Sequence, residues 1–157
     1  MADEDIVKLC PRDLAPLQAL LRANHLPADD CGEQASIFCA IYQAGELIAA
    51  GGLEPAGKYA LLRSLVVRAD HRGKGLAQAI TDHLLRQAEA EGRAAIYLLT
   101  ETAADYFLRR GFMPRARTEV PLPITRTRQF SSLCPDSASC LCLPLPRDRA
   151  RRRKRQA

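Results

Sequence analysis

A basic loop that joins an apolar strand to an amphipathic helix is the part of this sequence best suited to chemistry. The loop reads Asp70-His71-Arg72-Gly73-Lys74-Gly75, and the helix begins at Leu76-Ala77. Glycines let the main chain approach phosphate oxygens, the helix N-terminus supplies N–H donors, and Arg72 or Lys74 adds charge-assisted contacts. We therefore expect residues 72–77 to bind a phosphate-bearing ligand, with a basic tight turn as the plainer alternative. The P-loop pattern and the dinucleotide pattern G-x-G-x-x-G are both absent.

Hydrophobic period and turn residues predict the elements that position this loop. We expect strands at 6–9, 37–42, 46–53, 59–67, 95–99 and 141–145. We expect helices after Asp13, from Leu76 to just before Gly92, between Thr102 and Gly111, and near 124–132. Thr102 with Asp105 resembles a capping box, and Gly51-Gly52 predicts a bulge or a close backbone approach. The expected fold class is one α/β (α+β) domain with a mixed sheet.

Length and composition exclude several classes of protein. The chain has 157 residues, 47% of them hydrophobic and 26% charged, which is typical of one globular domain rather than of a disordered chain. No apolar run approaches the ~20 residues of a membrane helix. The acidic start Met1–Asp5 lacks the residue order of a signal peptide. We therefore expect a cytoplasmic protein that does not span a membrane.

The formal net charge of +5 is concentrated at one end of the chain. Seven of the 23 basic residues and one of the 18 acidic residues fall in 147–157, which leaves 16 basic and 17 acidic residues in 1–146. We expect a domain over 1–146, a solvated and disordered tail over 147–157, and no nucleic-acid partner. A weak, salt-sensitive phosphate-binding arm is the alternative for the tail.

The cysteines and histidines do not form an evident metal site. The six cysteines stand at positions 10, 31, 39, 134, 140 and 142 with no C-x-x-C pair, so we expect reduced thiols and no metal. Cys140 and Cys142 would share one face of a strand, which suits a pair of core residues. Together with Cys134 they could instead bind trivalent arsenic or sense redox state. The three scattered histidines are expected in solvated or loop positions: His25, His71 and His83.

Two segments resemble the GNAT superfamily of N-acetyltransferases. Arg72-x-x-Gly75-x-Ala77 after Leu65-Val66-Val67 resembles its acetyl-CoA pyrophosphate loop, and the apolar strand 95–99, a short helix and Gly111-Phe112 resemble its second signature. The resemblance implies a mixed, mostly antiparallel sheet flanked by helices and splayed between strands 59–67 and 95–99. It also implies that acetyl-CoA is the cosubstrate and lies in the splay.

A finer resemblance is to the branch of arsenic-resistance N-acetyltransferases. It rests on Leu61–Val67, Leu98–Ala103, Val120-Pro121 and Phe130–Ala138. It implies that the acceptor is the primary amine of a small molecule, either amino-acid-like or organoarsenical. The link to arsenic resistance describes a setting and leaves the acceptor itself open.

The resemblance also implies roles for individual positions. Main-chain groups of Leu65, Val66 and Val67 would pair with the pantetheine amides and polarise the thioester carbonyl, and the N–H groups of 72–77 would hold the pyrophosphate. Thr100 stands where many members have an Asn, and we count it with the cofactor-binding residues. The amine would attack the thioester directly, aided by proximity and by donors to the oxyanion.

One aromatic position departs from the family pattern. Phe107 stands where many members have a Tyr that protonates the leaving thiolate. Its neighbour Tyr106 lies about 100° around the helix and cannot simply replace it. We expect Phe107 to be a core aromatic and leave the general acid unassigned.

The general base and the acceptor-binding residues come from the strands. Glu54 is the first candidate for a base that deprotonates the ammonium group, directly or through water, with an exposed loop carboxylate as the alternative. Glu101 ranks below it because it would point opposite to Thr100 on an extended chain. Arg63 and Ser64 are candidates for acceptor binding, Arg63 through a bidentate contact to a carboxylate, with a surface ion pair as the alternative.

Two other functions stay open beside a small-molecule acetyltransferase. The absent Tyr and the C-terminal cysteines favour an acetyl-CoA-binding, arsenic-responsive sensor with little catalysis. Acetylation of a protein N-terminus or a lysine would require an open peptide groove. An exposed last strand near 139–145 would offer an edge for a homodimer.

Overall fold

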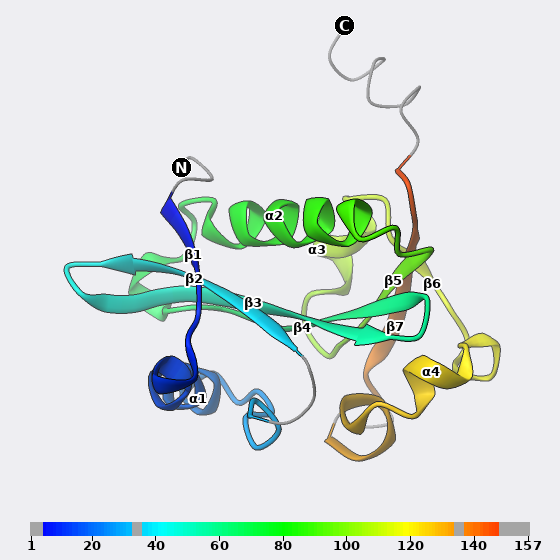
Figure 1. The fold of residues 1–157 in the computed structure, drawn as a ribbon, viewed down its shortest axis with the longest axis horizontal. Helices are drawn as coiled ribbons and strands as arrows, with labels where there is room; N and C mark the ends of the chain where they lie inside the picture. Colours follow the sequence, from blue (N-terminus) through cyan, green and yellow to red (C-terminus); the bar gives the residue numbers. More distant parts are fainter. Residues whose placement is uncertain (1–4, 33–35, 134–136, 148–157) are drawn as a thin grey trace, which may run out of the picture.

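A seven-stranded sheet forms the middle layer of the computed structural model, which describes residues 5–32, 36–133 and 137–147 (Figure 1). Within these ranges the strand order is β1-β2-β3-β4-β5-β7-β6. All neighbours are antiparallel except β4 and β5, which are parallel. The strands are β1 (Ile6–Lys8), β2 (Ile37–Gln43), β3 (Glu46–Ala56), β4 (Tyr59–Val67), β5 (Ala95–Thr100), β6 (Met113–Pro114) and β7 (Ser139–Pro144). The predicted fold class, a mixed and mostly antiparallel sheet with helices, is confirmed.

Helices cover both faces of this sheet. In Figure 1, α2 and α3 lie on one face, and α1 and α4 lie on the other. The α-helices are α1 (Leu14–Ala23), α2 (Leu76–Ala90), α3 (Ala104–Leu108) and α4 (Leu122–Thr125). Shorter 3-10 turns lie at Pro11–Asp13, Ala69–His71 and Arg117–Glu119, and a π-helical turn lies at Gln129–Leu133. The helix predicted near 124–132 is therefore two short pieces.

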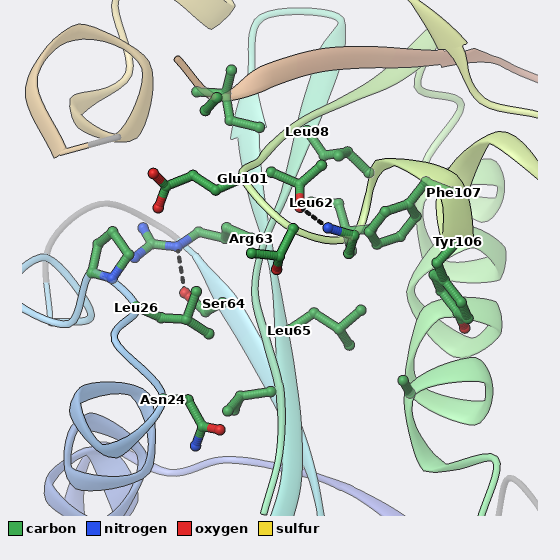
Figure 2. Close-up of a pocket in the computed structure, with 18 of the residues that line it drawn as sticks. Asn24, Leu26, Leu62, Arg63, Ser64, Leu65, Leu98, Glu101, Tyr106 and Phe107 are labelled. Carbon is green, nitrogen blue, oxygen red and sulfur yellow. Dashed lines mark hydrogen bonds between the residues drawn. The ribbon is translucent and has the colours of Figure 1, made fainter. Parts of the chain in front are cut away.

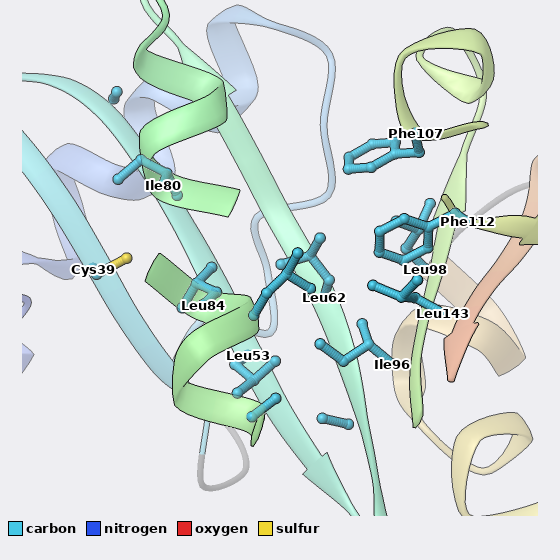
Figure 3. Packing of buried hydrophobic residues seen from close by; sticks show 14 of the residues in the cluster. Cys39, Leu53, Leu62, Ile80, Leu84, Ile96, Leu98, Phe107, Phe112 and Leu143 are labelled. Atoms are coloured by element: carbon cyan, nitrogen blue, oxygen red, sulfur yellow. The ribbon is translucent and has the colours of Figure 1, made fainter. Parts of the chain in front are cut away.

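The face under α2 holds the largest apolar core (Figure 3). Ile80 and Leu84 of α2 pack against Leu53, Leu62 and Ile96 of the sheet. On the opposite face, apolar residues of α1 pack on β2 and β4 in a separate cluster. Burial at about 25 cal/mol per Å² of apolar surface is what holds these layers together.

Gly51-Gly52 predicted a bulge or a close backbone approach, and both are present, with the extra residue of the bulge on the partner strand β4. Ala50 pairs with Val66 while Gly52 pairs with Arg63, so β4 carries one extra residue opposite Gly51. A Cβ atom on Gly51 would lie 2.6 Å from Ile80 Cγ2, so only glycine allows α2 to approach the sheet here.

The predicted splay between β4 and β5 is also present. The two strands pair at Ala60↔Ile96 and Leu61↔Tyr97, near their starts, and they form no further pair within the described residues. Beyond Leu61 the main chain of β4 therefore has no strand partner on its β5 side within the described sheet. This gap is where a substrate arm can lie.

Two local predictions were wrong. Thr102 does not cap α3, because the chain turns earlier: the Thr100 hydroxyl accepts a 3.0 Å hydrogen bond from the Ala103 N–H, and the helix begins at Ala104. The last strand is not an edge. β7 lies between β5 and β6 in the described sheet, because the two-residue strand Met113–Pro114 pairs with its outer side.

The residues predicted to begin or end helices and strands did so in some cases and not in others. α2 ends at Ala90, and Gly92 follows with a left-handed φ of 74°, as predicted. Asp13 precedes α1, but its carboxylate accepts the Cys10 N–H at 3.1 Å and no helix N–H. β3 continues past Leu53 to Ala56, because its pairing with β4 runs to the Ala56↔Tyr59 hairpin.

Cys140 and Cys142 are buried in the core, as predicted. They pack with Tyr97 and Ile124 on the face covered by α4. Burial raises the pKa of Cys140 to about 11 and also raises that of Cys142. Cys134 lies outside the described residues. In the described part of the chain no group of three His, Cys, Asp or Glu side chains is placed to hold a metal.

No helix in the described ranges combines the length and apolar character needed to cross a bilayer.

Candidate active site

A cleft of about 590 Å³ opens where β4 and β5 separate (Figure 2). Its floor is β4 from Leu61 to Val67, and its walls come from several other parts of the chain. These walls contain residues 24–27 after α1, residues 98–103 around the end of β5, Tyr106 and Phe107 of α3, and Gln129 with Ala138. Arg72 and Ala77 also line it, so the cleft reaches the basic loop. We call the part lined by Arg72 and Ala77 the phosphate end, and the part lined by Ser64, Glu101 and Gln129 the acceptor end.

The bulge in β4 shapes the floor between the two ends. Ser64 has a left-handed φ of 57°, which is uncommon for a residue with a side chain. The bulge interrupts the β3–β4 ladder, and Leu65, Val66 and Val67 follow it along the cleft. Main-chain N–H and C=O groups on the β5 side of this stretch are therefore suited to pair with an extended substrate arm.

The phosphate end has the features expected of an anion site. Gly73 and Gly75 have φ of 78° and 81°, and a Cβ on either would meet nothing within 4 Å, so backbone conformation and not space requires glycine here. Gly75 precedes α2 without any side-chain cap, and the first turn of α2 has no acidic residue. The first N–H groups of α2 thus remain available to an anion.

Cations stand at both sides of this loop. Arg72 donates to the Asn24 side-chain oxygen across the mouth of the cleft, and the Lys74 ammonium lies 3.3 Å from His71 Nδ1. Both basic side chains are exposed. The loop therefore offers N–H donors and positive charge to the same ligand.

Arg68 anchors the turn before the loop, which sequence reasoning missed. Its Nε and Nη2 donate to the two oxygens of Asp70 at 2.7 and 3.1 Å, and its Nη1 donates to Glu46 at 2.6 Å. These hydrogen bonds lower the pKa of Asp70 and raise that of Arg68. The Arg-x-Asp spacing at the strand end was the available signal, but Glu46 is brought there only by the sheet.

Glu54 and Arg63 lie in surroundings that the sequence did not predict. Arg63 Nη1 donates to Glu54 Oε1 at 3.0 Å, and neither side chain is more than 3% exposed. The alternatives of an exposed loop carboxylate and a surface ion pair are both wrong, because β3 continues past Glu54 and pairs it into the sheet. Glu54 is not among the residues that line the cleft. The geometry thus gives its carboxylate the task of holding Arg63.

Arg63 has two further partners. Its Nη2 donates to Asp30 at 2.5 Å, and its Nε donates to the Ser64 hydroxyl at 3.2 Å. Its guanidinium also lies 5.4 Å from the centre of the Phe38 ring. Binding an acceptor carboxylate would require this guanidinium to leave partners that already neutralise it. Asp30 is a site residue that no motif in the sequence indicated.

The aromatic pair in α3 is part of the core. Phe107 is 4% exposed and packs edge-to-face on Phe112 and Tyr106, at 5.4 and 5.1 Å between ring centroids, so the core prediction is confirmed. Figure 2 shows the Tyr106 hydroxyl directed toward α2 and away from β4. Burial raises the pKa of this hydroxyl. Neither ring therefore offers a hydroxyl group to the floor of the cleft.

Glu101 lies on the cleft, contrary to the expected direction. The hydrogen bond of Thr100 to the Ala103 N–H turns the chain directly after β5, so the residues no longer alternate as in a strand. Glu101 is exposed and lines the acceptor end, and Thr100 lines the cleft beside it. Among the histidines, His25 also lines the cleft, with a φ of 58°.

Comparison with known proteins assigns the class. Residues 8–112 match the model of the Acetyltransferase (GNAT) family, and the chain belongs to that family. It is therefore an acyltransferase. The splayed strands, the bulged floor and the glycine loop fit acetyl-CoA as its cosubstrate.

Solved structures share the fold at low sequence identity. N-acetylglutamate synthase from Neisseria gonorrhoeae, complexed with coenzyme A and N-acetyl-glutamate, matches with a TM-score of 0.75 and 17% identity. The match covers 90% of this chain but 35% of the synthase, so this chain spans about a third of that protein. Rv2747 from Mycobacterium tuberculosis, in complex with CoA, matches with a TM-score of 0.72, 18% identity, and 89% and 98% coverage of the two chains. The ribosomal-protein-S18-alanine N-acetyltransferase from Escherichia coli matches with a TM-score of 0.67, 20% identity, and 89% and 92% coverage.

Proposed function

We propose that this protein transfers the acetyl group of acetyl-CoA to the primary amine of a small molecule in a ternary complex. The observation that carries the proposal is a single cleft that joins an anion-binding glycine loop to a polar acceptor end across a bulged strand. One cleft that holds both substrates lets the amine attack without a covalent enzyme intermediate.

The chain's own residues divide the work of binding the cosubstrate. N–H groups of residues 72–77 would hold the pyrophosphate, with Arg72 and Lys74 adding charge. Main-chain groups of Leu65, Val66 and Val67 would pair with the pantetheine arm and donate to the thioester oxygen as it gains charge. Thr100 would line the arm from the β5 side.

The transfer itself needs one proton acceptor at the acceptor end. The ammonium group of the acceptor loses one proton to this group, its nitrogen forms a bond to the acetyl carbon, and the carbon–sulfur bond breaks. The nitrogen then gives up a second proton, which the departing CoA thiolate takes up, so that CoA leaves as the thiol. We propose Glu101 as the proton acceptor, directly or through a water, because its carboxylate lines the cleft whereas that of Glu54 is engaged by Arg63. Ser64, which also lines the cleft, would contact the acceptor.

The acceptor class is proposed from the size of the site and the family. Residues 24–27 and 129 line one cleft with β4, and a confined cleft of this kind would suit a small amine better than an extended peptide. The N-acetylglutamate synthase described above shares the fold, and its name indicates that its acetylated product is an amino acid. Four further points stay predictions from the sequence: an amino-acid-like or organoarsenical amine as the acceptor, a role in arsenic resistance, a cytoplasmic location and a homodimer.

The test is mass-spectrometric detection of acetylated product. The purified chain and acetyl-CoA would be incubated with amino acids, polyamines, peptides and amino-bearing arsenicals, because a free-thiol assay would be confounded by six cysteines. A product from one class of small amine supports the proposal and names the class. A product from peptides alone would contradict the small-molecule acceptor.

A sensor with little catalysis is the second candidate. It is favoured by one observation, that neither Phe107 nor Tyr106 presents a hydroxyl to the floor of the cleft. Measurable acetyl-CoA binding without product from any amine in the panel would select it over the enzyme.

A further inference from the structure

Arg63 is a fully buried cation beneath the acceptor end of the cleft. The side chains of Arg63 and Asp30 are 0% exposed and that of Glu54 is 3% exposed. A buried charge is tolerated only with charged or hydrogen-bonding partners, and here one guanidinium lies between two carboxylates. The three side chains together carry a net negative charge. Arg63 is therefore already neutralised from within the protein.

The Asp30 carboxylate connects three distant segments of chain. It accepts from Arg63 of β4, and both of its oxygens lie 3.3 Å from Gln129 Nε2 of the π-helical turn. These partners are 33 and 99 residues away in the sequence. Leu26, shortly before Asp30, lies beside Ser64 and forms one wall of the acceptor end, and Gln129 lines the cleft as another (Figure 2). One carboxylate thus fastens both walls to β4.

The space for this cluster is provided by Gly52 of β3. A Cβ atom on Gly52 would lie 2.6 Å from the Phe38 ring and 3.3 Å from Arg63 Cγ. The ring and the arginine stem therefore occupy the volume that any larger residue would fill. Because Arg63 directly precedes Ser64, the cluster is fixed next to the bulge in β4.

We propose that Arg63, Asp30 and Gln129 are positioning residues that hold the two walls of the acceptor end at a set place relative to the bulge, and that Arg63 does not bind a carboxylate of the acceptor. The proposal rests on the proposed transferase function. Loosening the cluster would impair the use of the acceptor and leave acetyl-CoA binding intact. Acceptors with and without a carboxylate would lose rate equally, because the guanidinium touches neither.

The first test does not depend on activity. Gln129→Ala removes the hydrogen bonds to Asp30 and leaves the Arg63 ion pairs in place, whereas Arg63→Met would leave two carboxylates unpaired and is expected to unfold the chain. Hydrogen exchange would be followed in the 24–32 segment, where the Leu26 N–H is bonded to the Leu21 carbonyl. Gln87→Ala on α2, which removes a 3.3 Å hydrogen bond to Glu91, is the matched control.

We expect exchange in 24–32 to be about tenfold faster in the Gln129→Ala variant, with α2 unchanged and with no effect in the control. Asp30→Asn should give the same pattern, and the double variant should add little to either single one. Unchanged exchange in 24–32 would overturn the proposal.

The second test uses a pair of amines that differ by one carboxylate, L-lysine and cadaverine. We expect Gln129→Ala to lower kcat/KM about tenfold for both, with KM for acetyl-CoA unchanged. A fall in kcat/KM for L-lysine alone would overturn the proposal and indicate a contact to the carboxylate. An equal fall in kcat/KM for the amine and for acetyl-CoA, together with a lower Tm, would also overturn it, because the cluster would then only stabilise the fold. If no amine gives product, the proposed function has failed, and the exchange test still decides the cluster.

Discussion

The two ends of the cleft are built in opposite ways. The phosphate end is one continuous stretch, 72–77, with an exposed loop at 72–75, two left-handed glycines and a helix N-terminus. The acceptor end uses Asp30, Arg63 and Gln129, which are buried and come from three segments. A loop before a helix follows from local rules of backbone conformation, whereas a buried cluster exists only after the sheet has assembled. Cofactor and acceptor binding should therefore respond to different substitutions.

The largest difference between the effect on the acceptor and the effect on acetyl-CoA is expected from Glu101→Gln. Removing the proton acceptor should lower kcat/KM for the amine by about 100-fold or more, because general-base catalysis contributes on that order. Acetyl-CoA affinity should stay the same, since Glu101 lies at the other end of the cleft. Steady-state kinetics and calorimetric titration measure the two quantities. Glu119→Gln, an exposed carboxylate outside the cleft, is the control, and similar losses in both variants would exclude the assignment.

The converse change is the double replacement Gly73→Val and Gly75→Val. Valine at φ of 78° and 81° is strained by about 1–3 kcal/mol per residue, so the loop should leave its binding conformation. We expect acetyl-CoA to bind about 100-fold more weakly, while hydrogen exchange in 26–32, which lies beyond the Arg72–Asn24 contact, stays as in the parent. Gly92→Val introduces the same strain at φ 74° after α2 and should spare cofactor affinity. Unchanged affinity in the double variant would refute the loop assignment.

The reactivity of the buried cysteines tests whether these thiols could bind arsenic in the folded protein. Burial raises the pKa of Cys140 to about 11 and that of Cys39 to about 12, so both are neutral thiols at pH 8. We expect both to react with iodoacetamide about 100-fold more slowly than exposed Cys10, and at the rate of Cys10 in denaturant.

The sign of the pH dependence follows from the same shifts. The folded state favours the neutral thiol, so Cys140 contributes stability below a pH of about 9, which is lost as the pH rises through about 11. Mass spectrometry of the labelled peptides and unfolding curves between pH 8 and 11 measure both effects. Native labelling of Cys140 and Cys142 at the rate of Cys10 would instead favour the sensor.

The smallest effect is expected from removing residues 148–157. Arg147, the first residue of the predicted tail, lies 2.5 Å from Glu89 of α2 and would be retained. We expect KM for acetyl-CoA to change by less than about twofold at physiological salt. A loss that grows at low salt would show that the tail is a phosphate-binding arm after all, because such contacts weaken with salt.

The phosphate loop and its surroundings were predictable because each feature depends on neighbours in the sequence. The bulge was readable from Gly51-Gly52, the end of α2 from Gly92, and the core position of Phe107 from the apolar spacing of its helix. The same reasoning failed where a side chain's partner is remote. Glu54 was predicted as the general base, with an exposed loop carboxylate as the alternative, because nothing near it in the sequence shows that its side chain meets Arg63.

The direction of the Glu101 side chain is another feature that the sequence pattern does not reveal, although its cause lies only a few residues away. On an extended chain it points away from Thr100, and that expectation holds only while the strand continues. The strand ends at Thr100, where the Thr100 hydroxyl accepts a hydrogen bond from the Ala103 N–H, and the turn that follows brings Glu101 to the cleft. A single side-chain hydrogen bond competes here with strand periodicity, and the pattern of hydrophobicity does not reveal which prevails.

By itself, the sequence determined the family, the mixed sheet, the glycine-containing loop and the helix that follows it, because these depend on hydrophobic period, glycine conformation and contiguous motifs. Only the tertiary structure decided which side chains meet at the acceptor end. The physical reason is that burying a charge requires a partner of opposite charge, and the sheet supplies that partner from any distance along the chain. Asp30, Arg63 and Gln129 become one unit only when β4, the loop after α1 and the π-helical turn are packed together.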